Sequence, residues 1–511
     1  MRSLIRRAAV TAGTAVAAGA AVALMFAIAG PASALGAAVG SAQAQEKQYP
    51  YRLVDPGTFG GPGSFVVRPG LPIISNGTML GTADTTTPDP DLPVSDCGAF
   101  CDGYVQHAFA WRSGRLADLG ALAPAAQNNS GIFELNGNGV GAGGSENGLI
   151  DPLTRSPSQE ATIFDHGRVI GLGTLGGHES FAQNINSHGQ VAGISSNSTP
   201  DPFSSFFFGW RTETRAFVWR NGVMTDLGTL GGPDALETRQ NARGQIDGLS
   251  FTNSTANAAT GIPTTDPFLW ENGHMRDLGS LGGTFGGVGD GGLNNKGEVV
   301  GMSDLAGDQN AHPFLWRHGK MIDLGTPNGD FGFANYINQR GDSTGAYFAS
   351  DGNFHGVLWH HGKMVDLPPV GGAAQAFGNA INDRDQVVGN QSDSNFNEVS
   401  AALWTGGHGY DLNTLVGPSD FQMISADYIN NRGEIFGHGL YTSGPNAGDA
   451  RVFVLIRNPS VPLPADSTAG RLLPRAHPAN LSALALRARV GPGRGAAMSA
   501  VIRRILLDQR R

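Results

Sequence analysis

The chain has 511 residues, of which 76 are glycine and only 15% are charged, a composition typical of short strands and tight turns rather than long helices. Between residues 46 and 458 there are 41 acidic and 22 basic residues. This excess of negative charge argues against nucleic acid as a partner, because phosphate binding needs a basic surface. No later segment is long and apolar enough to span a bilayer, so we expect no transmembrane segment in the mature chain.

The N-terminal 44 residues have the layout of a secretory signal peptide. Arg2, Arg6 and Arg7 precede an Ala/Val-rich stretch, and small-x-small cleavage sites end at Ala34 and Ala44. We expect cleavage after Ala44, with Ala34 as the alternative site. An uncleaved membrane anchor is the alternative to a signal peptide. The mature protein is therefore predicted to be secreted or associated with the cell surface.

A unit of about fifty residues recurs eight times in the body of the chain. An aromatic residue marks each copy, at Trp111, Phe164, Trp219, Trp270, Trp316, Trp359, Trp404 and Phe453. Seven residues later stands an aspartate, replaced by glycine in the second copy, at Asp118, Gly171, Asp226, Asp277, Asp323, Asp366 and Asp411. We interpret these aromatic and aspartate residues as structural parts of the repeat.

The constant spacing of seven residues has a physical reason. Dipeptides such as Asn221-Gly222 suit two-residue hairpin turns, in which glycine tolerates a positive φ. Such a turn places Trp219 opposite Met224 and Phe217 opposite Asp226, so that Trp and Met share one face of the hairpin. The aspartate is expected to accept hydrogen bonds from backbone N–H groups of the following glycine-rich turn. A ligand-binding role for the aspartates is the alternative.

A second hairpin pattern follows in each copy, as in residues 185–193 with Asn186 at the first turn position. Asparagine at the first and glycine at the fourth position are typical of a type I turn. Asp385 replaces that glycine in one copy. In the first two copies the pattern is degenerate and ends at Gly81 and Gly141, which puts Ile74 and Glu134 at the asparagine position.

These motifs resemble the HAF-repeat family of probable extracellular proteins. The triplet that names the family stands here as His107-Ala108-Phe109, and altered forms occur at residues 215–217 and 312–314. Together with the Asp-Leu-Gly-Thr-Leu-Gly-Gly and Ile-Asn-x-x-Gly motifs, the resemblance covers roughly residues 50–458. It implies an exported or surface location. It implies no activity and offers no catalytic residues.

Two hairpins per copy make four strands, which is the content of a propeller blade. We therefore predict an all-β fold, a β-propeller of eight four-stranded blades over residues 48–458. Seven blades and an open β-solenoid are the alternatives. The chain enters in mid-copy at residues 51–61 and leaves it at 452–456, so pairing of these two strands would close the ring and remove its free edges.

Function is expected where the repetition fails. From the end of the second hairpin to the next aromatic position the first four copies span 30, 23, 26 and 22 residues, whereas the last four span 14 to 16. All four insertions occupy the same connection, so we expect them on one propeller face. The insertions within residues 142–160 and 249–266 are polar and carry no recognisable signal.

The first insertion contains a cysteine pair, Cys97 and Cys101, which we predict to form a loop disulfide in an exported protein. It also contains the acidic residues Asp89, Asp91 and Asp96. We expect a solvated loop there, with a Ca²⁺ site as the alternative because Ca²⁺ prefers oxygen ligands. No other cofactor or metal site is predicted.

The third insertion contains an aromatic run made of Phe203, Phe206, Phe207, Phe208 and Trp210. Exposed aromatic rings are costly unless used, so the run is a candidate binding patch. An extra strand packed on the blade is the alternative. The histidines His318, His360, His361 and His408 lie at or beside hairpin turns and are expected to be solvated, since a metal site would need them to converge.

Residues 459–511 do not repeat and contain nine arginines. We interpret them as a linker followed by a basic, partly helical tail that contacts an anionic cell surface, with a poorly ordered terminus as the alternative. The sequence therefore predicts a non-catalytic binding or adhesion module for an extracellular glycan or protein. The alternatives are a glycan hydrolase or lyase on the propeller, for which no acid pair can be singled out, and a structural surface-layer component.

Overall fold

The computed structural model describes residues 48–65, 77–91, 103–258, 260–327 and 330–465. Within these ranges the chain forms 32 β-strands and two short 3₁₀ helices, η1 (Ser204–Phe206) and η2 (Leu412–Thr414). The strands pair antiparallel in groups of four, which we term blades 1 to 8, and single bridges join some neighbouring blades into larger sheets. The signal peptide, Cys97, Cys101, Asp96, Ile74 and the tail beyond residue 465 lie outside the described residues.

The first four blades follow the chain in order. Blade 1 contains β2 (Gly60–Phe65), β3 (Met79–Pro88), β4 (Tyr104–Arg112) and β5 (Arg115–Gly120). Blade 2 contains β6 (Ser130–Leu135), β7 (Val140–Ile150), β8 (Pro157–Asp165) and β9 (Arg168–Gly171). Blade 3 contains β10 (Ser180–Ile185), β11 (Val191–Pro200), β12 (Thr212–Arg220) and β13 (Val223–Asp226). Blade 4 contains β14 (Ala235–Gln240), β15 (Ile246–Phe251), β16 (Thr265–Glu271) and β17 (His274–Asp277).

The next three blades repeat this arrangement. Blade 8 takes its fourth strand from the N-terminal end of the repeat region. Blade 5 contains β18 (Gly282–Leu293), β19 (Val299–Leu305), β20 (Ala311–Arg317) and β21 (Lys320–Asp323). Blade 6 contains β22 (Gly332–Ile337), β23 (Ser343–Phe348), β24 (Phe354–His360) and β25 (Lys363–Leu367). Blade 7 contains β26 (Gln375–Ile381), β27 (Val387–Ser392), β28 (Glu398–Thr405) and β29 (His408–Asp411). Blade 8 contains β30 (Phe421–Ile429), β31 (Ile435–Tyr441), β32 (Ala450–Arg457) and β1 (Tyr51–Val54).

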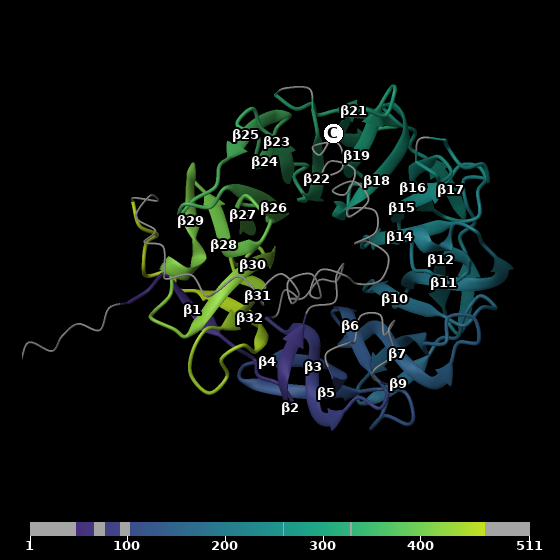
Figure 1. The fold of residues 1–511 in the computed structure, drawn as a ribbon, viewed down its shortest axis with the longest axis horizontal. Coiled ribbons are helices and arrows are strands. Elements are labelled where there is room, and N and C mark those ends of the chain that lie inside the picture. Colours follow the sequence, from purple (N-terminus) through teal and green to yellow (C-terminus); the bar gives the residue numbers. More distant parts are fainter. Residues whose placement is uncertain (1–47, 66–76, 92–102, 259, 328–329, 466–511) are drawn as a thin grey trace, which may run out of the picture. The chain divides into compact units, whose positions relative to one another are not determined.

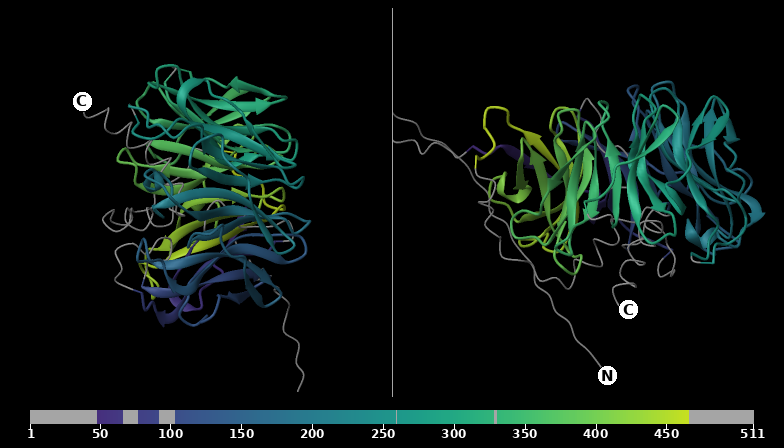
Figure 2. Two further views of the ribbon diagram at one scale, coloured as in Figure 1. Left: turned by 90° about the vertical axis from the view of Figure 1, so that its right-hand side faces the viewer. Right: turned by 90° about the horizontal axis from the view of Figure 1, so that it is seen from above.

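The two ends of the repeat region pair with each other and close the ring. β1 runs antiparallel to β32, with Tyr51 opposite Arg457 and Val54 opposite Val454. Each blade contacts the next one along the chain, and β2 of blade 1 contacts β32 of blade 8, so the blades follow one another around a ring (Figure 1). Seen from the side, the blades lie next to one another around the ring (Figure 2). The fold is therefore an all-β propeller with the predicted closing pair, and an open solenoid is wrong.

The predicted hairpin register is confirmed. Trp219 lies opposite Met224 and Phe217 opposite Asp226. The turn residues Asn221 and Gly222 have φ values of 50° and 86°, the left-handed conformation that a two-residue hairpin loop requires at both positions. This register puts Phe217 fully inside the core.

The repeat aspartates make the expected turn bonds. Asp118, Asp226, Asp277 and Asp323 each accept a hydrogen bond of 2.7–2.8 Å from the backbone N–H two residues later. Asp411 accepts one of 2.9 Å from Asn413. In Asp366 the geometry differs, because the residue two positions later is proline and the carboxylate instead accepts from the Tyr347 hydroxyl.

The histidine of the His-Ala-Phe triplet also contacts the repeat aspartate. His107 Nδ1 lies 2.9 Å from Asp118 Oδ2, and His107 Nε2 lies 2.9 Å from the carbonyl oxygen of Ala125. His312 makes the same contact with Asp323 at 2.9 Å. Burial would lower the pKa of His107, but the Asp118 carboxylate and the Ala125 carbonyl outweigh burial and raise it. The histidine of the triplet thus pairs with the repeat aspartate on the neighbouring strand of the same hairpin.

The asparagine turns link the blades to one another. Asn294 Oδ1 accepts from the backbone N–H of Lys296 and Glu298, which closes its own turn. Its Nδ2 donates to the carbonyl oxygen of Asn338, the equivalent residue of blade 6, at 3.1 Å. The side chains of Asn241, Asn338 and Asn382 donate to the next blade in the same way, at 3.0–3.1 Å. The motif therefore forms a buried ladder from blade 4 to blade 8.

The predicted alignment of blade 2 is wrong by two residues. Its turn starts at Asn136, which accepts from the N–H of Val140, and not at Glu134. The glycine equivalent to Gly193 is Gly143 and not Gly141, because a Cβ at either Gly143 or Gly193 would lie 2.0 Å from a backbone carbonyl oxygen of the neighbouring strand. Residues 137–144 contain five glycines, so spacing alone does not identify the one that needs to lack a side chain.

The hydrophobic core lies in layers between successive blades. Between blades 3 and 4, for example, Ala216 and Val218 pack with Phe268 and Trp270. The predicted linker after residue 458 joins one of these layers, since Leu463 packs on the core of blades 7 and 8 and the Tyr410 hydroxyl donates to the Pro464 carbonyl at 3.2 Å. Among the described residues, no helix has the length and apolar character needed to cross a membrane.

Candidate functional site

The four insertions leave the propeller at one face. They join the second strand to the third in blades 1 to 4, between β3 and β4, β7 and β8, β11 and β12, and β15 and β16. Each blade is an antiparallel meander, so this connection always lies at the end opposite to the two hairpin turns. As predicted, the insertions therefore share one face, which we term the insertion face.

The aromatic run of blade 3 closes into a compact loop over this face. The backbone N–H of Asp201 donates to the carbonyl oxygen of Arg211 at 3.0 Å, and η1 forms the tip. Phe207 and Trp210 are only 4% and 7% exposed. The predicted extra strand is therefore wrong.

The rings of the run cover the ends of inner strands. Trp210 stacks on Phe181 of β10, and Phe207 lies 5.3 Å from Phe251 of β15, measured between ring centroids. Phe203, Phe206 and Phe208 are partly buried against the same cluster. Phe207 and Trp210 therefore extend the core of blades 3 and 4, whereas Phe203, Phe206 and Phe208 keep part of their surface exposed. The binding patch stays a prediction for these three rings.

An exposed aliphatic tip lies instead on the insertion of blade 2. Leu149, Ile150 and Leu153 are 65%, 54% and 40% exposed. The tip is held in a tight turn, because Asp151 N–H donates to the Ser156 carbonyl oxygen and Asp151 Oδ1 accepts from Leu153 N–H at 2.7 Å. Sequence reasoning treated this insertion as polar. The signal that was missed is the run of three large aliphatic residues within five positions of a connecting loop.

Acidic groups meet between blades 1 and 2. Asp89 accepts from Asn129 Nδ2 at 3.1 Å and from Asp91 N–H at 3.0 Å, and Glu146 accepts from Asn129 N–H at 2.7 Å. Burial raises the pKa of Glu146 to about 7, with Asp89 and Asp91 adding to the rise. Two of the three predicted cation-loop residues thus lie near Glu146, while Ca²⁺ binding stays a prediction.

Two further acids with raised pKa values join neighbouring blades. Glu179 accepts from the backbone N–H of Gln159 at 2.8 Å, and burial raises its pKa to about 8. Asp234 accepts from Thr214 N–H at 2.6 Å, and burial together with the nearby Asp201 carboxylate raises its pKa to about 8. Both residues are buried. They bind the third strand of one blade to the start of the next instead of facing a substrate.

A small cavity lies between the inner strands of blades 4, 5 and 6. It measures about 80 Å³ and is lined by Leu236, Leu249, Phe285, Met302 and Phe333, among others. Pockets for small molecules typically measure about 300–1,000 Å³, so this cavity is too small for a sugar ring or a cofactor.

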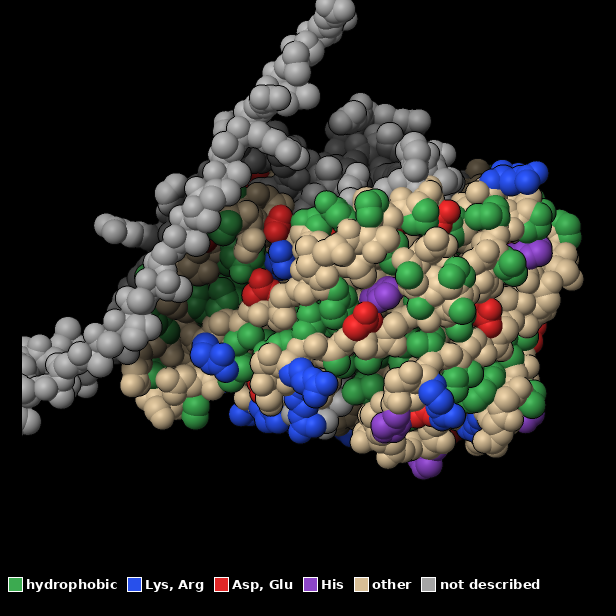
Figure 3. All heavy atoms as spheres, turned by 90° about the horizontal axis from the view of Figure 1, so that it is seen from below, with side chains coloured by type: hydrophobic (Ala, Val, Ile, Leu, Met, Phe, Trp, Pro, Cys, Tyr) green, Lys and Arg blue, Asp and Glu red, His purple; other side chains and the backbone are tan. Residues whose placement is uncertain are grey.

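The side of the ring seen in Figure 3 has no broad patch of one charge. Acidic and basic side chains stand singly or in small groups among hydrophobic and other polar ones. A nucleic-acid surface would show a continuous basic stripe. Figure 3 shows no such stripe on the side of the ring that it presents.

A group of metal-ligating side chains lies on the face opposite to the insertions. The possible ligand atoms of Asp342, His360 and His361 all lie within 4.8 Å of one another. These two histidines therefore do converge with a carboxylate, contrary to the expectation that they are simply solvated. His318 lies on a turn of blade 5 instead, and His408 begins β29 of blade 7.

Comparison with known proteins finds no matching family model and no matching curated protein. Solved structures with a similar arrangement are propeller domains. The β-propeller domain of the Trilobed protease from Pyrococcus furiosus gives a TM-score of 0.39 at 9% identity, covering 68% of this chain and 95% of that one. Porphyromonas gingivalis dipeptidyl peptidase 4 gives 0.41 at 11% identity, covering 76% of this chain and 58% of that one.

A third similar structure is the acylaminoacyl peptidase of Pyrococcus horikoshii, with a TM-score of 0.37 and 9% identity over 74% of this chain. The chain spans 57% of the length of that peptidase. No activity carries over from these proteins, because likeness at this level concerns the fold alone.

Proposed function

We propose that this chain is a non-catalytic binding module of the cell exterior, whose insertion face contacts a protein partner through the tip formed by Leu149, Ile150 and Leu153. The observation that carries the proposal is the exposure of these three side chains. The described part of the chain has four further exposed large hydrophobic residues. They lie singly in the outer strands of different blades, at Ile170, Val223, Ile322 and Val365. Contiguous exposed apolar groups mark interaction sites.

The chemistry of the face favours a protein over a glycan. Sugar rings are commonly bound by exposed aromatic faces, and the rings of the aromatic run are buried or half-buried in the core of blades 3 and 4. An exposed aliphatic tip suits instead a protein partner, because the centre of a protein interface is apolar. Export through the N-terminal signal and contact of the basic tail with anionic polymers of the cell surface belong to the same proposal.

The hydrolase or lyase alternative is less well supported. Glycoside hydrolysis needs two carboxyl groups that face the substrate. Three acids with strongly raised pKa values on this face, Glu146, Glu179 and Asp234, are buried and accept hydrogen bonds from the backbone. They are unable to reach a polymer without unfolding of the joints between blades.

Binding of the purified mature chain to cell-envelope fractions tests the proposal. We expect the chain to be retained on intact envelope and lost after protease treatment of the envelope, but not after glycosidase treatment. The triple substitution Leu149→Ser, Ile150→Ser and Leu153→Ser should reduce retention at least tenfold, because each buried aliphatic side chain contributes about 1.5–3 kcal/mol.

The control replaces exposed aliphatic residues elsewhere, Val223→Ser with Val365→Ser, and should bind like the natural chain. Equal retention of the tip variant would contradict the proposal. Retention that survives protease but not glycosidase would point to a glycan. Self-association that the tip variant abolishes would indicate a structural surface-layer role.

A further inference from the structure

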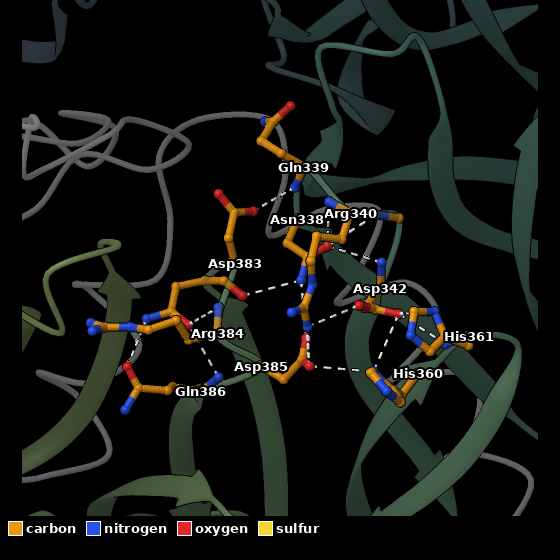
Figure 4. Close-up of polar contacts among 12 residues, drawn as sticks. Asn338, Gln339, Arg340, Asp342, His360, His361, Asp383, Arg384, Asp385 and Gln386 are labelled. Atoms are coloured by element: carbon orange, nitrogen blue, oxygen red, sulfur yellow. Dashed lines mark hydrogen bonds and ion pairs between the residues drawn. The ribbon is translucent and has the colours of Figure 1, made fainter.

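Two turns of blade 6 bring two imidazoles and a carboxylate together. Asp342 ends the turn between β22 and β23, while His360 ends β24 and His361 begins the turn between β24 and β25 (Figure 4). Asp342 Oδ1 lies 3.5 Å from His360 Nδ1 and 3.7 Å from His361 Nδ1. It also accepts a hydrogen bond of 2.9 Å from the backbone N–H of His361, which fixes the carboxylate against the turn.

The cluster lies where the repeat departs from its own pattern. The position of Asp342 holds a longer side chain in other blades, such as Gln190, Gln245 and Glu298. The shorter aspartate keeps its carboxylate beside the hairpin turn, where its side chain is 1% exposed. No other blade has two adjacent histidines in this turn. Two substitutions relative to the repeat, Asp342 and His360, thus meet beside His361.

A third departure is Asp385 of blade 7. It stands where blades 3 to 6 and blade 8 have glycine, and it keeps the positive φ of that glycine, 57°. A side chain in this conformation is strained. Its carboxylate reaches the cluster, since Asp385 Oδ2 lies 3.3 Å from His360 Nδ1 and pairs with the Arg340 guanidinium. Local backbone preference does not explain an aspartate here.

We propose that Asp342, His360 and His361 bind a divalent transition-metal ion of the Zn²⁺ class. Imidazole nitrogen with one carboxylate oxygen suits Zn²⁺, Ni²⁺ or Cu²⁺, whereas Ca²⁺ and Mg²⁺ prefer oxygen ligands throughout. Ligands 2.0–2.1 Å from a tetrahedral Zn²⁺ lie about 3.3–3.4 Å from one another. The observed 3.5 and 3.7 Å between Asp342 and the imidazoles need to shorten by only a few tenths of an ångström.

The neighbouring groups are arranged to support such an ion. His360 Nδ1 is shielded from solvent and makes no hydrogen bond, so no hydrogen bond to this nitrogen has to break before it binds an ion. Arg340 contacts Asp342 at Oδ2, 3.3 Å away, and leaves Oδ1 for the cluster. The pairing of Asp385 with Arg340 holds the second carboxylate beside His360, as outer groups orient metal ligands. Asp385 and Arg340 are therefore positioning residues.

The site would keep one coordination position open. His361 is 71% exposed and His360 is 39% exposed, so both rings are accessible from solvent, and a fourth position would remain for water or for a donor atom of another molecule. Three protein ligands with one open position are the arrangement of reactive, rather than purely structural, zinc sites. This site lies on the face opposite to the insertions and is independent of the tip around Leu149.

Zn²⁺ titration of the purified, untagged mature chain against a fluorescent chelator tests the proposal. We expect the natural chain to bind one Zn²⁺ per chain. The double variant His360→Ala, His361→Ala should bind Zn²⁺ with an affinity at least a hundredfold lower. Asp342→Asn, which keeps the acceptor for His361 N–H, should also bind at least tenfold more weakly. Co²⁺ bound to the natural chain should show the visible absorption of a four-coordinate ion, and the double variant should not.

Two further variants separate binding from folding. His318→Ala removes the histidine at the equivalent turn of blade 5 and should leave Zn²⁺ affinity unchanged. Asp385→Gly restores the glycine of the repeat, so it should fold at least as stably as the natural chain while Zn²⁺ affinity falls about tenfold. Stoichiometric binding that survives in the double variant, equal loss in His318→Ala, or absence of binding by the natural chain would overturn the proposal.

Discussion

At the scale of single residues, the repeat aspartate has two duties. Asp118 accepts the N–H of Gly120 and also contacts His107 across the hairpin. In blade 3 the histidine position holds Arg215, whose guanidinium lies 3.8 Å from Asp226. Blades 1 and 3 therefore contain equivalent cross-strand pairs. The cation is a titratable histidine in blade 1 and a permanently charged arginine in blade 3, so the two pairs can be compared within one chain.

This difference makes the contribution of blade 1 depend on pH. The pKa of His107 is raised above 6.5 in the folded chain, so its stabilising contribution is complete below pH 6.5 and is lost as the pH rises through the folded pKa. The pKa of Asp118 is lowered, since its bonds to His107 and Gly120 outweigh burial, and its contribution is lost only in acid. We expect His107→Gln to cost about 1 kcal/mol at pH 5.5 and less at pH 9.

Urea denaturation at the two pH values measures this effect. Arg215→Gln is the matched control, because arginine stays charged over this range and its cost should not change between pH 5.5 and 9. A cost of His107→Gln that is equal at both pH values would show that the imidazole contributes by packing alone.

At the scale of elements, the turn asparagine makes hydrogen bonds both within its own turn and to the next blade. Its Oδ1 closes the turn of its own blade, and its Nδ2 reaches the next blade. The local half follows from the Asn-x-x-Gly pattern, which predicted the turn. The bond from Nδ2 to the next blade depends on the distance between adjacent blades. The sequence of a single repeat carries no information on that distance.

Removal of one rung of this ladder should be costly. Asn294 is fully buried, so Asn294→Ala leaves the N–H groups of Lys296 and Glu298 without their acceptor and should cost about 2–3 kcal/mol. Gln339→Ala removes an exposed bond between the same two blades, Asn295 N–H to Gln339 Oε1, and should cost less than about 0.5 kcal/mol. Chemical denaturation compares the two variants, and equal costs would contradict the ladder.

At the scale of the whole molecule, stability depends on ring closure. Apolar layers lie between blades, not within them, so an unclosed ring exposes both an apolar face and the edge of β32. Deletion of residues 48–55 removes β1, the strand that pairs with β32. We expect this variant to dimerise or aggregate through the free edge.

Size-exclusion chromatography with light scattering detects that outcome. Deletion of residues 466–511, which leaves β1 and β32 intact, is the control and should leave the oligomeric state of the chain unchanged. A stable monomer after loss of residues 48–55 would mean that the β1–β32 pair is dispensable.

The sequence by itself determined the parts of this protein that depend on neighbours within one hairpin. Turn length and a side-chain period of two set the opposition of Trp219 to Met224, and spacing identified the turn bond of Asp226. Repetition of that unit, together with the half-copy at each end, predicted the propeller and its closing pair. The common face of the insertions followed from their position in the unit.

Only the tertiary structure decided what depends on distance between blades. It buried Phe207 and Trp210 against strands of blades 3 and 4, exposed Leu149, and brought Asp342 to His360 and His361. It also showed that Asn136, and not Glu134, begins the turn of blade 2. The physical reason is that local patterns define which face of a strand is apolar, whereas the contacts of a connecting loop depend on the surfaces that ring closure places beside it.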